Sequence, residues 1–228
     1  MPLSTRSKEP VYIRVLRLVL SGLMGALLVV SKQAMSGLPN IEPVTLLVIL
    51  FALELPRETP GAVTVFILLQ GVLYGFGLWW AMYLYVWYLL ALLAWLLRRM
   101  DNALGWAVFS GIYGLCFGGL CAAVYLVAKT PAFALSWWLS GLSYDAMHGV
   151  GNFVIMLLLY RPLRRALQTA KRQLRVELKR KASSPSPSLL AQCHLSQRER
   201  LWRNRELHGL TGNFAAMPRA LPLGELSP

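Results

Sequence analysis

Three polar side chains, Asp145, His148 and Asn152, recur at spacings of three and four residues in an otherwise apolar stretch. In an α-helix, these spacings place all three side chains on one face. If a membrane-spanning helix starts near Trp137, a rise of about 1.5 Å per residue places Asp145 roughly 12 Å from its outer end. Ionisable residues at that depth usually face a bundle interior and mark a substrate path. We therefore expect a binding site here, with hydrogen bonding between helices as the alternative.

A second group of polar and aromatic side chains is expected on the same side of the membrane. Aromatic walls stack on a flat ligand, and a few polar groups orient it. Trp and Tyr also form anchoring belts at both membrane interfaces, and that interpretation stays open for each aromatic residue. The candidate binding residues in this group are Asn40, Glu42, Gln70, Trp79, Trp80 and Tyr83, and Tyr85 and Trp87 belong to the same aromatic segment.

Several kinds of chemistry lack the residues that they need. His148 is the only histidine in the hydrophobic region, so a haem held by two histidines is excluded, and one Asp with one His is little for a metal site. The sequence has no Gly-x-Ser-x-Gly motif and no Walker phosphate loop. We expect no metal and no cofactor. A general acid/base pair of Asp145 and His148 in an intramembrane hydrolase remains open, although no nucleophile stands out.

The elements that would position these residues are membrane-spanning helices. The 228 residues are 56% hydrophobic and 14% charged, and no charge occurs from Phe66 to Leu97. A hydrocarbon core of about 30 Å requires roughly 20 apolar residues per helix. We predict an all-α integral membrane protein, a six-helix transmembrane bundle. Its helices are expected at residues 11–31, 43–56, 61–78, 80–97, 104–128 and 136–160.

The basic residues predict the orientation of this bundle. A net charge of +13 could indicate nucleic-acid binding, but the Lys and Arg residues lie at the ends of hydrophobic segments and in the C-terminal region. With six crossings, one side has only Lys32 and Lys129, and positive charge marks the cytoplasmic side. We therefore expect cytoplasmic N- and C-termini and no nucleic-acid partner. The residues that share the cytoplasmic side are Arg6, Lys8, Arg57, Arg98, Arg99, Arg161, Arg164 and Arg165.

Four segments follow from this pattern. Residues 1–10 form a cytoplasmic N-terminal segment, because the apolar stretch after it is long enough to be a retained helix rather than a signal peptide. Residues 11–162 form the transmembrane domain. Residues 163–181 are interpreted as a basic amphipathic helix on the anionic leaflet or as a plain extension of the last helix. Residues 182–228 are too poor in apolar periodicity for a core and are predicted to be a disordered cytoplasmic tail.

Small residues in the first helix provide a candidate contact with another helix. Ser21 and Gly25, and Gly22 and Ala26, form two overlapping four-residue spacings. In lipid, such spacings allow two helix backbones to approach closely. They favour either packing inside the chain or the docking of a partner helix.

Three stretches resemble the substrate-binding S component of bacterial energy-coupling factor (ECF) vitamin transporters: GLPNIEPVTL at 37–46, LYGFGLWW at 73–80 and DAMHGVGNF at 145–153. The resemblance implies a bacterial plasma-membrane protein of six helices that captures a vitamin or related micronutrient near its outer face. It also implies partners, a transmembrane coupling subunit and two ATPases. The positions that match the family's docking face are Ser21, Gly22, Gly25 and Ala26.

We therefore interpret the chain as a binding subunit for ATP-driven uptake and not as an enzyme. Two alternatives stay open: an intramembrane enzyme that uses Asp145 and His148, and a stand-alone secondary carrier. The second is weakened by the lack of an internal sequence repeat of the kind that many carriers show. The sequence does not identify the substrate, because many flat compounds would suit aromatic walls with a few polar groups.

Overall fold

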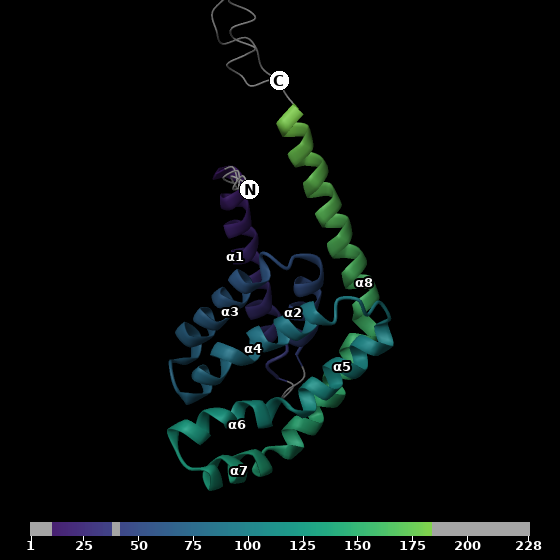
Figure 1. Cartoon of the computed structure of the whole chain (residues 1–228). Helices are drawn as coiled ribbons and strands as arrows, with labels where there is room; N and C mark the ends of the chain where they lie inside the picture. The colour runs from purple at the N-terminus through teal and green to yellow at the C-terminus, as the bar shows by residue number, and fades with distance from the viewer. Residues whose placement is uncertain (1–10, 38–41, 184–228) are drawn as a thin grey trace, which may run out of the picture. The chain divides into compact units, whose positions relative to one another are not determined.

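The computed structural model describes residues 11–37 and 42–183, and within them every regular element is an α-helix. Segment 1–10, Asn40 and residues 184–228 of the predicted tail lie outside the described residues. The chain divides into two units, Met1–Lys171 and Arg172–Pro228. The first unit contains every helix up to the middle of the last one. The described part of the second unit is the final stretch of that helix (Figure 1).

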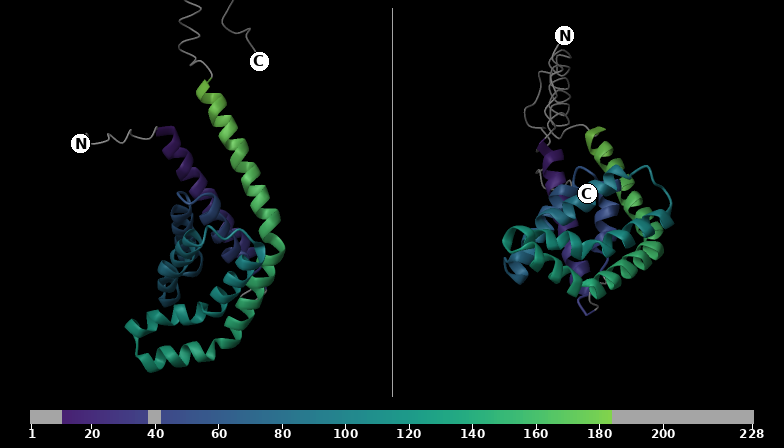
Figure 2. Two further views of the ribbon diagram at one scale, coloured as in Figure 1. Left: turned by 45° about the vertical axis from the view of Figure 1, so that its right-hand side comes forward. Right: turned by 60° about the horizontal axis from the view of Figure 1, so that its bottom comes forward.

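Eight helices follow one another in the described residues. They are α1 (Val11–Ala34), α2 (Val44–Glu54), α3 (Thr59–Tyr74), α4 (Leu78–Leu96), α5 (Ala103–Leu115), α6 (Phe117–Ala128), α7 (Pro131–Ser140) and α8 (Leu142–Ser183). In the first unit, α1 packs on α3, α2 on α4, and α4 on α6, while α6 and α7 form an antiparallel hairpin (Figures 1 and 2).

Four of the described stretches are long and apolar enough to cross a membrane: Val11–Ala34, Leu78–Leu96, Ala103–Ala128 and Leu142–Arg180. The predicted class, an all-α membrane protein with several crossings, is thereby confirmed. The apolar helices α2 and α3 are shorter. With 11 residues, α2 rises only about 16 Å. Nearly every side chain of α2 is buried, so this short helix forms the centre of the core.

Two predicted helices are each divided by a break. The segment expected at 104–128 breaks at Cys116 into α5 and α6, and the segment expected at 136–160 breaks at Gly141 into α7 and α8. The latter also begins earlier, because the Thr130 side chain accepts a hydrogen bond from the backbone N–H of Phe133 and Pro131 occupies the first helical turn. Sequence periodicity does not show such breaks, since the residues on both sides are apolar.

The last helix continues past the predicted end of the transmembrane domain. α8 runs through Pro162 to Ser183 without interruption. The basic stretch expected at 163–181 is therefore helical and continuous with the last predicted crossing, and both interpretations of its surroundings stay predictions.

An ionic network joins α2 to α8 at the end of α2. Glu54 accepts hydrogen bonds from Arg164 Nε at 3.0 Å and from Gln168 Nε2 at 2.7 Å, while Lys171 Nζ donates to the Glu54 carbonyl at 2.5 Å. Arg164 also contacts Asp101, with Nη1 2.5 Å from the carboxylate. Cationic side chains at a helix C-terminus complement its partial negative charge, so this network fixes the end of the central helix.

Candidate functional site

Aromatic side chains form a ladder along one face of α4. Trp79, Tyr83 and Trp87 are one turn apart, and each adjacent pair packs edge to face with ring centroids 5.5 Å apart. Trp87 lies 5.6 Å from Phe117 of α6, whose ring lies 4.7 Å from that of His148 in α8. The ladder therefore leads from the start of α4 to the polar face of α8.

An ion pair lies beside this ladder. Lys32, near the end of α1, places its Nζ 2.5 Å from a carboxylate oxygen of Glu42, and both side chains are largely buried. The same ammonium group lies 6.0 Å from the centre of the Tyr83 ring. Glu42 and Tyr83, which the sequence proposed as binding residues, are thus brought together by a lysine.

The three polar residues of α8 are buried, as their spacing predicted. Both carboxylate oxygens of Asp145 accept hydrogen bonds from other residues of the chain. Oδ1 accepts the backbone N–H of Gly118 at 2.9 Å, and Oδ2 accepts the Trp138 indole N–H at 3.2 Å. Gly118 is in the first turn of α6, where backbone N–H groups have no helical partner and negative charge is favourable. Asp145 therefore joins the start of α6 to the end of α7.

Residue 118 must be very small for this arrangement. A Cβ on Gly118 would overlap the Asp145 carboxylate, and a Cβ on Gly114 would lie 2.8 Å from the Gly149 backbone. The two glycines thus allow α5 and α6 to approach α8 closely, which is the packing that their four-residue spacing favours.

Five buried side-chain atoms have no hydrogen-bond partner among the described residues. They are Thr45 Oγ1, Gln70 Nε2, Trp87 Nε1, His148 Nε2 and Asn152 Nδ2, and the five residues are between 0 and 3% exposed. Roughly nine in ten buried polar groups in proteins have a partner. The helices α2, α3, α4 and α8 all contribute to this set.

Ring contacts place Trp87 and His148 at the aromatic ladder, and helical spacing places Asn152 and Gln70 near it. His148 adjoins Phe117 and hence Trp87, and Asn152 follows His148 by one helical turn. Gln70 follows by one turn Phe66, which contacts the Trp87 ring at 5.5 Å. Together with the Lys32 and Glu42 pair, these groups define the candidate site, which we call the interior polar site. Thr45, in the first turn of α2, lies three residues after Glu42 and is assigned to it on that ground.

The other predicted site residues have different surroundings. Trp80 donates its indole N–H to the Ile67 carbonyl at 2.9 Å and packs on Phe76, so it fixes the connection between α3 and α4. Trp79 forms the end of the ladder at the start of α4, against Tyr74. Asn40 belongs to the segment that the structure does not describe.

Sequence reasoning missed four members of the site as binding residues: Lys32, Thr45, Trp87 and Phe117. Trp87 carried a usable signal, because it continues the one-turn spacing of Trp79 and Tyr83. Thr45 stands in the same motif as Glu42. Lys32 was treated only as a charge that flanks a helix, and nothing in the local sequence links Phe117 to His148.

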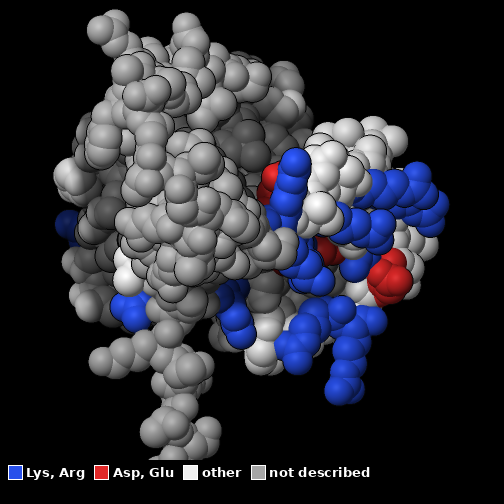
Figure 3. All heavy atoms as spheres, turned by 90° about the horizontal axis from the view of Figure 1, so that it is seen from above, with Lys and Arg blue, Asp and Glu red and all other residues white. Residues whose placement is uncertain are grey.

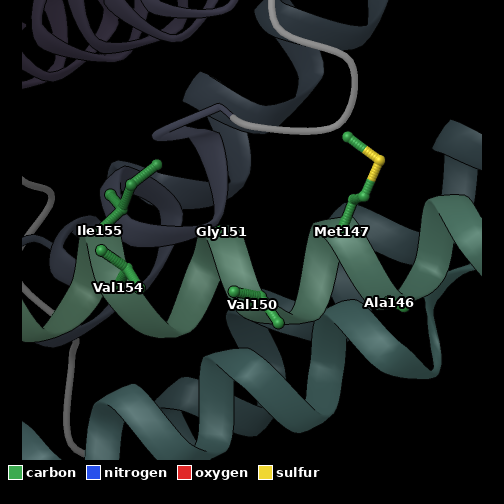
Figure 4. A pocket seen from close by; sticks show the side chains of 6 residues that line it. All are labelled: Ala146, Met147, Val150, Gly151, Val154 and Ile155. Carbon is green, nitrogen blue, oxygen red and sulfur yellow. The ribbon is translucent and has the colours of Figure 1, made fainter.

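A separate apolar groove runs along another face of α8 (Figure 4). Its volume is about 480 Å³, and residues from successive turns of that helix line it: Ala146, Met147, Val150, Gly151, Val154 and Ile155. Val150 is 64% exposed. Such a surface suits contact with lipid chains, and it contains none of the unpartnered polar atoms.

The described residues contain no group of three or more His, Cys, Asp or Glu that could hold a metal ion. Comparisons with protein-family models, with characterised proteins and with solved structures found no match. The fold and the site thus define a class only, an α-helical membrane protein with several crossings and a polar interior. Its resemblance to ECF S components rests on the three sequence stretches alone.

Proposed function

We propose that the chain is the substrate-binding subunit of an ECF-type importer, which captures a micronutrient for ATP-driven uptake by partner subunits. The observation that carries this proposal is the interior polar site. Unpaired polar atoms in a membrane protein are costly, and polar residues at such depth usually serve a substrate path. Aromatic rings beside those atoms provide the apolar walls that small-molecule sites commonly have.

The proposed topology has six crossings and cytoplasmic ends in a bacterial plasma membrane. Four crossings are the long apolar stretches, and α2 and α3 supply the two shorter ones. The end of α2 and the middle of α8 would share the cytoplasmic side, where a polar hollow of about 390 Å³ is lined by Asp101, Tyr160, Arg161, Arg164, Arg165 and Gln168. Figure 3 shows Lys and Arg side chains in blue on the part of this face that is not grey. The three arginines of the hollow supply the positive charge that is typical of a cytoplasmic side, and they support the orientation.

The small residues of α1 divide into two pairs with different surroundings. Ser21 donates to the Glu58 carbonyl at 3.1 Å, and a Cβ on Gly25 would lie 2.6 Å from Val65, so this pair packs on α3 within the chain. A Cβ on Gly22 would meet no described atom within 4 Å, and Ala26 is exposed. The docking face for the coupling subunit is therefore proposed at Gly22 and Ala26.

Uptake into proteoliposomes tests the proposal. The chain is reconstituted with and without an ECF coupling subunit and two ATPases, and a small-molecule extract of bacterial cells is supplied. We expect one compound to accumulate only when the partners and ATP are present. Gly22→Leu should abolish this uptake and leave ligand capture intact, because the larger side chain separates the two helices. Val30→Leu, at a position that is 62% exposed on the same helix, is the matched control.

Other outcomes would favour the alternatives. Accumulation without partners or ATP would indicate a secondary carrier, and chemical conversion of the compound would indicate an enzyme. The structure gives the enzyme alternative no added support, since the two Asp145 oxygens are bonded to Gly118 and Trp138.

A further inference from the structure

Among the described residues, the unpartnered groups of the interior polar site are mainly hydrogen-bond donors. The Trp87 indole N–H can only donate a hydrogen bond, it is fully buried, and it has no acceptor among the described residues. The amides of Gln70 and Asn152 each contain two further donor hydrogens, and the nitrogen of each is also unpartnered within the described part of the chain. A ligand that satisfies these groups must present several hydrogen-bond acceptors.

The charges around the site restrict the net charge that the ligand can carry. Lys32 and Glu42 neutralise each other at 2.5 Å, so neither is free to bind a full charge on a ligand. The remaining nearby carboxylate, that of Asp145, is bonded to Gly118 and Trp138. His148 contributes one more unpartnered ring nitrogen, which can donate or accept.

The aromatic rings beside the site favour a flat ligand. Tyr83, Trp87 and Phe117 form a continuous series of rings with centroid separations of 5.5 and 5.6 Å. Rings of this kind stack on or pack edge to face against a flat partner. An aliphatic ligand would gain less from them.

We infer that the interior polar site binds an uncharged, flat heterocycle whose edge carries carbonyl oxygens or ring nitrogens as acceptors. This inference rests on the proposed function, because it assigns the ligand class of the same site. The Trp87 N–H donates to one acceptor, and the Gln70 and Asn152 amides bind the others. A permanent cation is disfavoured, because Glu42 is paired with Lys32, Asp145 is bonded to Gly118 and Trp138, and the unpartnered nitrogens of Trp87, Gln70 and Asn152 are donors.

A panel of four probes tests this ligand class by calorimetry on the full chain in mild detergent. Uracil, hypoxanthine and lumichrome are uncharged heterocycles of increasing size with acceptor edges, and thiamine is a cation. We expect at least one of the three to bind and thiamine not to bind. Trp87→Phe should weaken that binding about tenfold, the effect of one lost hydrogen bond. Trp80→Phe is the control, because its indole N–H bonds to the Ile67 carbonyl, and its affinity should match that of the unaltered chain.

Binding of thiamine alone, binding of none of the four, or an unchanged affinity in Trp87→Phe would each overturn the inference. If Trp87→Phe fails to fold, Gln70→Leu takes its place, with the same expected weakening. The proposed function is judged separately. ATP-driven uptake of a cation would refute the ligand class and leave the importer function standing. Binding of a heterocycle without any uptake in the presence of the partners would refute the importer function and leave the ligand class standing.

Discussion

Replacing Asp145 by leucine is expected to lower the free energy of unfolding by about 2 to 4 kcal/mol, because two donors would lose their acceptor. These donors are the backbone N–H of Gly118 and the indole N–H of Trp138. Asp145→Asn keeps one acceptor oxygen and should lower it by about 1 kcal/mol. Thermal unfolding of the purified chain in detergent measures both. Met147→Leu, on an exposed part of the same helix, should have little effect.

The same variants decide whether Asp145 also contacts the ligand. If Asp145 only joins α6 and α7, the folded fraction of Asp145→Asn retains the ligand affinity of the unaltered chain. An Asp145→Asn protein that unfolds at the original temperature and binds ligand at least tenfold more weakly would instead make the carboxylate a direct binding group, as its position on the polar face first indicated.

Removing unpartnered polar atoms should have the opposite effect on stability. In a chain that carries both Thr45→Val and Asn152→Leu, the free energy of unfolding should rise by about 1 to 3 kcal/mol, because buried polar atoms without partners are replaced by apolar groups of similar shape. The midpoint of thermal unfolding should rise by roughly 2 to 4 °C per kcal/mol. The same double variant should lose ligand capture.

Ser110 provides the matched control for this experiment. Its hydroxyl is also fully buried, but the oxygen lies 3.1 Å from the backbone carbonyl oxygens of both Ala107 and Asn152, so its one hydrogen has an acceptor. Ser110→Ala should therefore lower stability by about 1 kcal/mol. A double variant that loses stability as Ser110→Ala does would show that Thr45 and Asn152 have structural partners, and the interior polar site would lose two members.

The polar face of α8 could be predicted from the sequence because helical periodicity alone determines it. Asp145, His148 and Asn152 share a face in any α-helix. Exposing polar side chains to lipid costs free energy, so this face is predicted to point into the bundle. The roles of these residues could not be predicted in the same way. Only the fold shows that Asp145 is bonded to Gly118 while His148 Nε2 has no partner among the described residues.

Contacts between distant segments account for what the sequence did not show. Lys32 meets Glu42 and Tyr83 only when α1, α2 and α4 assemble. Just after the break at Cys116, the first turn of α6 bonds to the Asp145 carboxylate of α8, 27 residues further along the chain. The division of the α1 small residues likewise depends on where α3 packs, because Ser21, Gly22, Gly25 and Ala26 are equivalent in local sequence.

Native mass spectrometry of the full chain tests the central claim, capture at the interior polar site, most directly. The purified protein is incubated with a small-molecule extract of bacterial cells and released from mild detergent, beside the Thr45→Val and Asn152→Leu double variant. We predict one bound compound of a single mass on the unaltered chain and none on the folded double variant. A folded, unaltered chain with no bound compound, or the same compound on both proteins, would contradict this claim.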